Sequence, residues 1–302
     1  MVTNRFNAWD ALGEDISSAT CVDDAIQMAN LDWKVVQAPV LEGLTGSVIP
    51  KCYANIRDVD NTCLGIVTGK YQIVQNDEAF DFVDNLIPRG AEFIRAGMFR
   101  AGRAIWLLVK LPSFNILGDA VDNYLVFINS HDGCGSIKCC LTPTRVACSN
   151  TLNLALSTAY RRWSSTHVGN LQQKLAQADE VFQLSQNYAV ALQEEANKLA
   201  MSHLSQNDVN SLIEKTFPTT PNLTRRQLDN IYESRSLFIN EFYNSTDLQN
   251  YKGTKWAYLN AVADYVDHVT PKRNTSTYTL SNWNRIVQGH SVLDATYELL
   301  SA

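Results

Sequence analysis

The sequence predicts an α+β protein, with a mainly antiparallel, hairpin-rich sheet and packed helices in its first half and an all-helical second half. Two observations indicate this. Up to residue 168, short β-prone runs alternate with turn residues at hairpin spacing. From residue 170 to residue 204, apolar residues recur at near-helical spacing in a stretch without Gly or Pro. We therefore divide the 302 residues into a loose leader (1–17), an α+β domain (18–168) and a helical region (169–302).

In the first half, strands are expected where β-branched and aromatic residues run between turn residues, and helices where a capping residue precedes a helical apolar pattern. Asn76 is expected to cap one helix, and Pro143 to start another that ends near Arg162. The expected elements are a helix at 18–30, an extended segment at 31–40, a hairpin of 52–57 and 63–68, a helix at 76–87, a hairpin of 91–98 and 103–111, strands at 123–129 and 136–141, and a helix at 143–162.

In the second half, the helical patterns are interrupted only by short breaks, among them Pro218 and Pro221. Their Tyr, Gln and Asn residues suit either internal packing or an interface with another subunit. No heptad pattern is regular enough for a coiled coil. The expected helices are 170–204, 208–217, 223–243, 254–269 and 281–300.

Composition places the chain among ordinary globular proteins, with 45% hydrophobic and 19% charged residues. No apolar run approaches the roughly 20 residues of a membrane span, and the first residues include acids and lack the apolar core of a signal peptide. Seven cysteines, an odd number spread over a long chain, favour reduced thiols. We expect a protein of the cytoplasm, without a membrane partner.

Charge is distributed unevenly along the chain. The net charge is −6, but residues 89–174 contain ten lysines and arginines against four acids, a local +6 that leaves −12 for the remainder. No acid occurs between Asp132 and Asp179. Such asymmetry predicts a positive face on an acidic body; a chance fluctuation on a solvated face is the alternative.

Residues 131–152 hold four of the cysteines. A zinc site would need ligands that converge, but Cys139 and Cys140 are adjacent and would point to opposite faces of a strand. Buried structural cysteines are the better interpretation. Thiol catalysis would pair His131 or His167 with Cys134 or Cys148, although no nucleophile motif is present.

Other enzyme signatures are also missing. The sequence contains no Gly-rich phosphate loop. Asp58, Asp60 and Asp132 could bind Mg²⁺, but all three lie in expected turns, where Asp is common anyway. We therefore expect no catalytic residues, no metal and no cofactor.

The hairpin of residues 91–111 is the strongest functional candidate. It combines four basic residues with three aromatic ones: Arg95, Arg100, Arg103 and Lys110, with Phe93, Phe99 and Trp106. Arginines that contact phosphates beside aromatic rings that stack on bases are typical of single-strand binders. By alternation Phe93 and Arg95 share a face, Gly97 marks a bulge, and Trp106 lies opposite Ile105. The alternative is structural: an aromatic core face whose arginines protect a sheet edge.

Several stretches together resemble the phage- and plasmid-borne family known as domain of unknown function 932. They are LDWKVVQAPV, YANIRDVDNTCLGIVTGKYQIVQNDEAFDFVDNL, SHDGCGSIKCCLTPTRVACSNTLNLAL and THVGN, and they cover roughly residues 31–204. The resemblance implies a mobile-element, usually bacteriophage, origin and no established activity. In element order such proteins are distantly similar to phage single-strand annealing proteins, which is an analogy of fold only.

The expected function is therefore a non-enzymatic, phage-encoded protein that binds single-stranded DNA, promotes annealing or recombination, and forms a homo-oligomer in the host-cell cytoplasm. The candidate nucleic-acid-binding residues are Arg95, Phe99, Arg100, Arg103, Trp106, Lys138, Arg145, Arg161 and Arg162. For Arg161 and Arg162, stabilisation of a helix C-terminus is a structural alternative. Two further functions stay open: an interaction module that targets a host defence or replication protein, and a metal-dependent nuclease.

Overall fold

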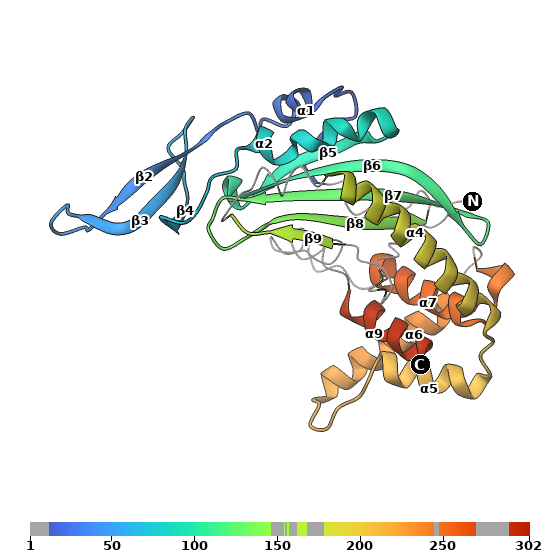
Figure 1. The fold of residues 1–302 in the computed structure, drawn as a ribbon. Helices are drawn as coiled ribbons and strands as arrows, with labels where there is room; N and C mark the ends of the chain where they lie inside the picture. Colours follow the sequence, from blue (N-terminus) through green and yellow to red (C-terminus); the bar gives the residue numbers. More distant parts are fainter. Residues whose placement is uncertain are drawn as a thin grey trace.

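The computed structural model describes residues 12–145, 154, 156, 162–167, 178–244, 248–269 and 290–302. Within these ranges, two antiparallel sheets occupy the first half of the chain and helices dominate the second half, as Figure 1 shows. The expected α+β class is confirmed. No described helix has both the length and the apolar character needed to cross a bilayer.

The larger sheet has six strands in the order β1-β5-β6-β7-β8-β9, and the smaller sheet has three in the order β2-β3-β4. Both expected hairpins are present, as β3 with β4 and as β5 with β6. The strands are β1 (Glu14–Asp15), β2 (Val35–Leu41), β3 (Val48–Arg57), β4 (Cys63–Thr68), β5 (Glu92–Phe99), β6 (Ala104–Ile116), β7 (Asp119–Ser130), β8 (Ile137–Arg145) and β9 (Arg162–Ser165).

One face of the six-stranded sheet carries the main hydrophobic core. Alternate residues of β6, such as Ile105 and Leu107, point into it and are fully buried. Helix α1 (Val22–Met28), helix α2 (Asn76–Phe80) with the 3₁₀ turn η1 (Asp81–Asn85), and the first half of α4 (Ala178–Met201) pack on this face. Cys139 belongs to this core, whereas Cys140 belongs to a smaller cluster on the opposite face. The expectation that the two thiols lie on opposite faces is confirmed.

The helical part is built around α7 (Lys255–Asp264), in which every residue from Trp256 to Asp264 is buried. It contacts α4, α6 (Arg225–Asn244) and α9 (Ser291–Ser301), and the rings of Tyr258 in α7 and Tyr265 just after it meet the Phe238 ring of α6 edge to face. The other helices are α5 (Gln206–Thr216) and the π-helical turn η5 (Tyr265–Val269). Asn123 of β7 donates a hydrogen bond to Ser185 of α4 (2.6 Å), which joins this part to the sheet.

The expected helix at 143–162 is wrong where the structure describes it. Pro143, Thr144 and Arg145 continue strand β8 opposite β7, and Arg162 begins strand β9. Among the described residues, β9 pairs with residues 137–140 of β8 and none pairs with Pro143 on that side, so its missing N–H interrupts no described ladder there. Most of the remaining positions of that helix lie outside the described residues.

Three smaller expectations also need correction. Helix α2 is capped by Gln75 rather than Asn76, whose side chain turns inward. The described end of the leader is packed, because Ile16 is fully buried and β1 pairs with β5. The bulge in β5 falls between Phe93 and Arg95 rather than at Gly97, so these two residues lie on opposite faces.

Candidate nucleic-acid interface

The turn between β5 and β6 has a left-handed backbone. Arg100 (φ 51°), Ala101 (φ 57°) and Gly102 (φ 89°) all have positive φ values. Each non-glycine residue in this conformation costs roughly 1–2 kcal/mol. A Cβ on Gly102 would lie 3.0 Å from the Arg57 guanidinium and 3.3 Å from the Trp33 ring, so the turn packs closely on the smaller sheet. Strain of this kind recurs at functional sites, which makes the turn a candidate.

The two arginines of this turn have different surroundings. Arg100 is about half exposed and forms an ion pair with Asp132 at 3.4 Å. Arg103 is exposed, and no described carboxylate pairs with it; its backbone carbonyl accepts a hydrogen bond from the N–H of His131 (2.8 Å). The turn therefore presents one partly neutralised and one uncompensated guanidinium.

Asp132 organises the following turn through one carboxylate oxygen. That oxygen accepts hydrogen bonds from the Ser130 hydroxyl (2.8 Å) and from the backbone N–H groups of Cys134 (2.9 Å) and Gly135 (3.0 Å). Burial by itself would raise the pKa of Asp132, but these hydrogen bonds and the charge of Arg100 bring the pKa below its usual value. The carboxylate is therefore ionised, and its hydrogen bonds stabilise the turn that follows β7.

The other two turn aspartates are also engaged in structural contacts. Asp60 accepts two hydrogen bonds from the Arg57 guanidinium, at 2.9 Å and 2.6 Å. Asp58 accepts one from the backbone N–H of Lys34 (2.9 Å). In the part of the chain that the structure describes, no group of three His, Cys, Asp or Glu residues is placed to hold a metal ion.

The remaining candidates of the hairpin are less available to a ligand. Arg95 donates hydrogen bonds to the carbonyl oxygens of Leu12 (2.6 Å) and Gly13 (2.8 Å), so it fastens the segment before β1 to the sheet. Trp106 is only 1% exposed in the smaller hydrophobic cluster and cannot stack on a base in this conformation. Phe99 is half-buried and stacks on Trp106, with ring centroids 6.0 Å apart.

Strand register brings two more candidates to the face of the six-stranded sheet that carries Trp106. Lys138 of β8 pairs with Ile128, which pairs with Trp106, and Arg162 of β9 pairs with Cys140. Both basic residues therefore lie on the face of Trp106. Lys138 is half-buried and Arg162 is exposed, and neither has an ion-pair partner within the described ranges. Arg145 ends β8, with only its backbone described, and Arg161 lies outside the described residues.

A buried polar network, which we did not predict, joins the two sheets next to the turn. His131 is fully buried, and its Nε2 lies 2.9 Å from the Asn76 Oδ1. The His131 carbonyl accepts a hydrogen bond from the Asn55 amide (2.8 Å), and its ring meets the edge of Trp33 with centroids 5.5 Å apart. Burial, and to a lesser degree the charge of His167, lowers the pKa of His131 to about 3. The ring is therefore neutral, sealed from solvent, and unable to act as a base for Cys134.

His167 is also part of this junction. Its ring stacks on Tyr71 at 4.7 Å, and its Nδ1 lies 3.3 Å from the Gln72 carbonyl oxygen. Burial lowers its pKa as well. Tyr71 in turn donates a hydrogen bond to the Ser130 carbonyl (2.8 Å). Both histidines that we considered for thiol catalysis thus have structural surroundings.

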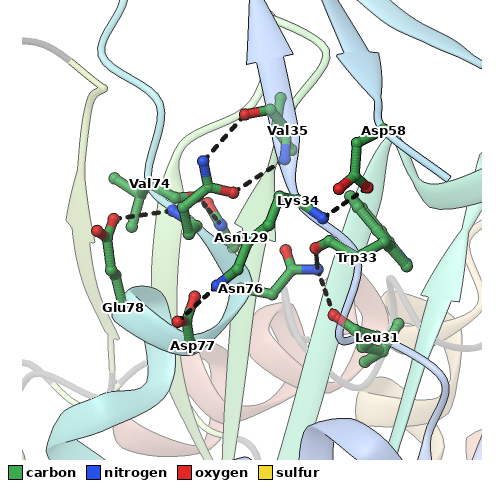
Figure 2. Close-up of polar contacts among 11 residues, drawn as sticks. Leu31, Trp33, Lys34, Val35, Asp58, Val74, Asn76, Asp77, Glu78 and Asn129 are labelled. Carbon is green, nitrogen blue, oxygen red and sulfur yellow. Dashed lines mark hydrogen bonds and ion pairs between the residues drawn. The ribbon is translucent and has the colours of Figure 1, made fainter. Parts of the chain in front are cut away.

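Figure 2 shows how the network continues to the edge of the smaller sheet. The Gln75 side chain donates to the carbonyl oxygen of Val35 and accepts from its N–H, both at 2.9 Å, and so takes the place of a neighbouring strand. Asn76 donates to the Leu31 carbonyl (2.7 Å), and Asn129 donates to the Val74 carbonyl (2.9 Å). Sequence reasoning missed these amides because their partners are distant along the chain. The only sequence feature that pointed to this junction was the His131-Asp132-Gly133 turn.

These features define a class: an α+β protein whose basic hairpin turn is held against a second, small sheet by a buried polar network. The chain belongs to the family described as Domain of unknown function (DUF932), whose model matches residues 63–287. The match begins at β4 and includes the basic turn and the His131 side of the network. No curated protein and no solved structure matches the chain.

Proposed function

We propose that this protein binds single-stranded DNA without cleaving it, through the β5–β6 turn and the adjoining face of β8 and β9. One observation carries the proposal. Arg103, Lys138 and Arg162 are exposed or half-exposed cations of one sheet that have no carboxylate partner among the described residues. Uncompensated cations are what a phosphate backbone neutralises, with release of its counterions.

Arg100 adds a fourth phosphate contact. Its ion pair with Asp132 is long at 3.4 Å and the Arg100 side chain is about half exposed, while the largely buried Asp132 carboxylate has three other hydrogen bonds. A phosphate oxygen can therefore take the place of the carboxylate at small cost. Phe99 offers its partly exposed ring to a base, while Trp106 supports that ring from behind. In this arrangement Trp106 and Arg95 position the site and do not touch DNA.

The mobile-element origin that the family resemblance implies suggests the setting. We place the protein in a bacteriophage, acting in the host cytoplasm as a homo-oligomer that promotes annealing or recombination. Sequence-independent binding of single strands suits such a role, because phosphate contacts and stacking tolerate any base.

The test is a fluorescence anisotropy titration with a labelled oligonucleotide at several salt concentrations. Arg103→Glu plus Arg162→Glu should weaken binding. It should also flatten the dependence of log K on log salt by about 1.4, because each single-strand phosphate that the protein no longer neutralises reduces the slope by roughly 0.7. The matched control is Arg225→Glu plus Arg226→Glu, two exposed arginines in the first turn of α6, where acids are well tolerated.

The two variants change the net charge equally, so a loss of binding that is equal in both would reject this surface. No binding by the unmodified protein at low salt would reject DNA as the ligand. The same samples, incubated with and without Mg²⁺, test the nuclease alternative, for which we expect the oligonucleotide to stay intact. If DNA is not bound, capture of a host protein by the helical half becomes the preferred function.

A further inference from the structure

The three-stranded sheet β2-β3-β4 projects from the body of the molecule as an arm, seen at the left of Figure 1. Two turns of the body touch strand β4 of this arm in succession. A Cβ on Gly102 of the β5–β6 turn would lie 3.6 Å from Leu64, near the start of β4. A Cβ on Gly133 of the β7–β8 turn would lie 2.8 Å from Val67, near its end. Strand β4 therefore leads away from the basic β5–β6 turn.

Two lysines lie at the far end of β4. Lys51 and Lys70 are both exposed, and no carboxylate of the described residues pairs with either. The Lys51 carbonyl accepts a hydrogen bond from the backbone N–H of Gly69 (3.2 Å), so Lys51 lies beside the residue that precedes Lys70. The five residues from Leu64 to Gly69 span about 17 Å in an extended chain. The arginine turn and the lysine pair therefore lie at opposite ends of one short strand.

An aromatic ring accompanies the two lysines. Tyr53 of β3 pairs with Val67, so its half-buried side chain lies on the face of the arm that contacts Gly133. A Cβ on Gly69 would lie 3.4 Å from the Tyr53 ring, and the glycine places no side chain there. Cations beside an aromatic ring form the combination that single-strand binders use. We call Lys51, Tyr53 and Lys70 the arm patch.

The backbone of Lys51 gives a second indication of function. Lys51 has a φ of 61°, a left-handed conformation that favours glycine. Its described hydrogen bond to Gly69 uses the backbone carbonyl, which any residue supplies. A lysine held in a strained backbone while its ammonium group is exposed points to a role for the side chain.

The charges around the arm patch favour a polyanion. Residues 43–57 and 61–76 contain no Asp or Glu. The nearest acids along the chain are Glu42, Asp58 and Asp60, and each already accepts hydrogen bonds from the protein. An acid-free surface with two unpaired lysines suits a phosphate backbone, and the Tyr53 ring favours a nucleic acid over an acidic polypeptide.

We propose that a bound single strand of DNA runs from the β5–β6 turn along β4 to the arm patch. There Lys51 and Lys70 contact phosphates, and Tyr53 stacks on a base. Between the two ends the strand passes the β7–β8 turn, where Cys134 is exposed. This inference rests on the proposed function, and it adds a second anchoring point to the surface described there.

The first test is an anisotropy titration of the full-length variant Lys51→Gly plus Lys70→Gln over a series of salt concentrations. Loss of two phosphate contacts should flatten the dependence of log K on log salt by about 1.4. The advantage of the unmodified protein should therefore grow about 25-fold for each tenfold fall in salt. The matched control is Lys215→Gln plus Lys252→Gln, two exposed lysines of the helical half, which should leave the slope unchanged.

Two single variants separate binding from folding. Lys51→Gly should weaken DNA binding and cause no loss of stability in thermal unfolding, because glycine adopts the φ of 61° without strain. A lysine with a purely structural role would give the opposite pair of results. Tyr53→Leu should weaken binding by about fivefold or more through the lost stacking, with the salt slope unchanged.

The second test uses Cys134 as a reporter of the path. A bound oligonucleotide should slow alkylation of Cys134 by iodoacetamide, measured by peptide mass spectrometry. Cys63 is the internal control, because it is also exposed but pairs with Ile56, on the other face of the arm from Asn55. Equal alkylation of Cys134 with and without DNA would overturn the path.

The outcomes also separate this inference from the proposed function. If the unmodified protein bound no oligonucleotide at low salt, both would fail. If Arg103→Glu plus Arg162→Glu flattened the salt slope and the arm variant did not, the strand would end at the β5–β6 turn and only this inference would fail. Binding of polyglutamate at the arm patch in place of DNA would assign the patch to an acidic protein and would likewise reject it.

Discussion

Replacement of Asn76 by Ala should be one of the most damaging single changes at the junction of the two sheets. The Asn76 amide donates to the Leu31 carbonyl (2.7 Å), and its oxygen lies 2.9 Å from the His131 Nε2. Truncation to Ala leaves both of these buried groups without the partner that Asn76 supplies, and the His131 Nδ1 already has no hydrogen-bond partner among the described residues. A buried group left unsatisfied costs about 1–3 kcal/mol, so we expect a loss of about 2–6 kcal/mol in the free energy of unfolding.

That loss is a large share of the roughly 5–15 kcal/mol that holds a typical domain together. Urea unfolding followed by circular dichroism measures it. The control is Asn210→Ala on the exposed surface of α5, for which a change within about 0.5 kcal/mol is expected. If Asn76→Ala cost less than about 1 kcal/mol, the buried network would not stabilise the junction in the way we describe.

Two further predictions concern the same junction. His131 has an ordinary pKa of 6.5 when unfolded and about 3 when buried, so below pH 6.5 the unfolded chain takes up a proton that the folded chain refuses. Stability should therefore fall by about 2 kcal/mol between pH 7 and pH 5 in urea titrations. His131→Gln should reduce that dependence and the exposed His203→Gln should not; an unchanged slope in His131→Gln would contradict the assigned burial. Gly65→Ala should destabilise by at least about 1–3 kcal/mol, because its Cβ would lie 2.5 Å from the Asp132 carbonyl oxygen, whereas Gly43→Ala, with open space around it, should be neutral or slightly stabilising in thermal unfolding. Equal effects of the two glycine variants would show that the close approach is absent.

Local sequence patterns predicted the structure correctly where it depends on residues that are neighbours along the chain. Alternation along a strand predicted the opposite faces of Cys139 and Cys140, and of Ile105 and Trp106. This works because the side-chain period of a strand is a property of the backbone. The same reasoning failed at Phe93 and Arg95, because a bulge adds one residue and reverses the faces beyond it.

Pro143 illustrates the opposite situation. A proline after turn residues is typical of a helix start, and only the arrangement of neighbouring strands makes a strand possible there. Pro143 pairs with Asn123 of β7 and so stays in β8, and no described residue pairs with it on the β9 side. The proline's own residue type does not decide between the two structures.

The sequence alone determined the α+β class, the two hairpins, the uneven charge, the opposite faces of the adjacent cysteines and the resemblance to the family. The tertiary structure alone decided which candidates are available to a ligand: Trp106 is buried and Arg95 is bound to backbone, whereas Arg103 stays exposed. It also decided that His131 is structural. The reason is distance along the chain, because the partners of His131, Asn76 and Asn55, lie 55 and 76 residues away, and no local period carries that information.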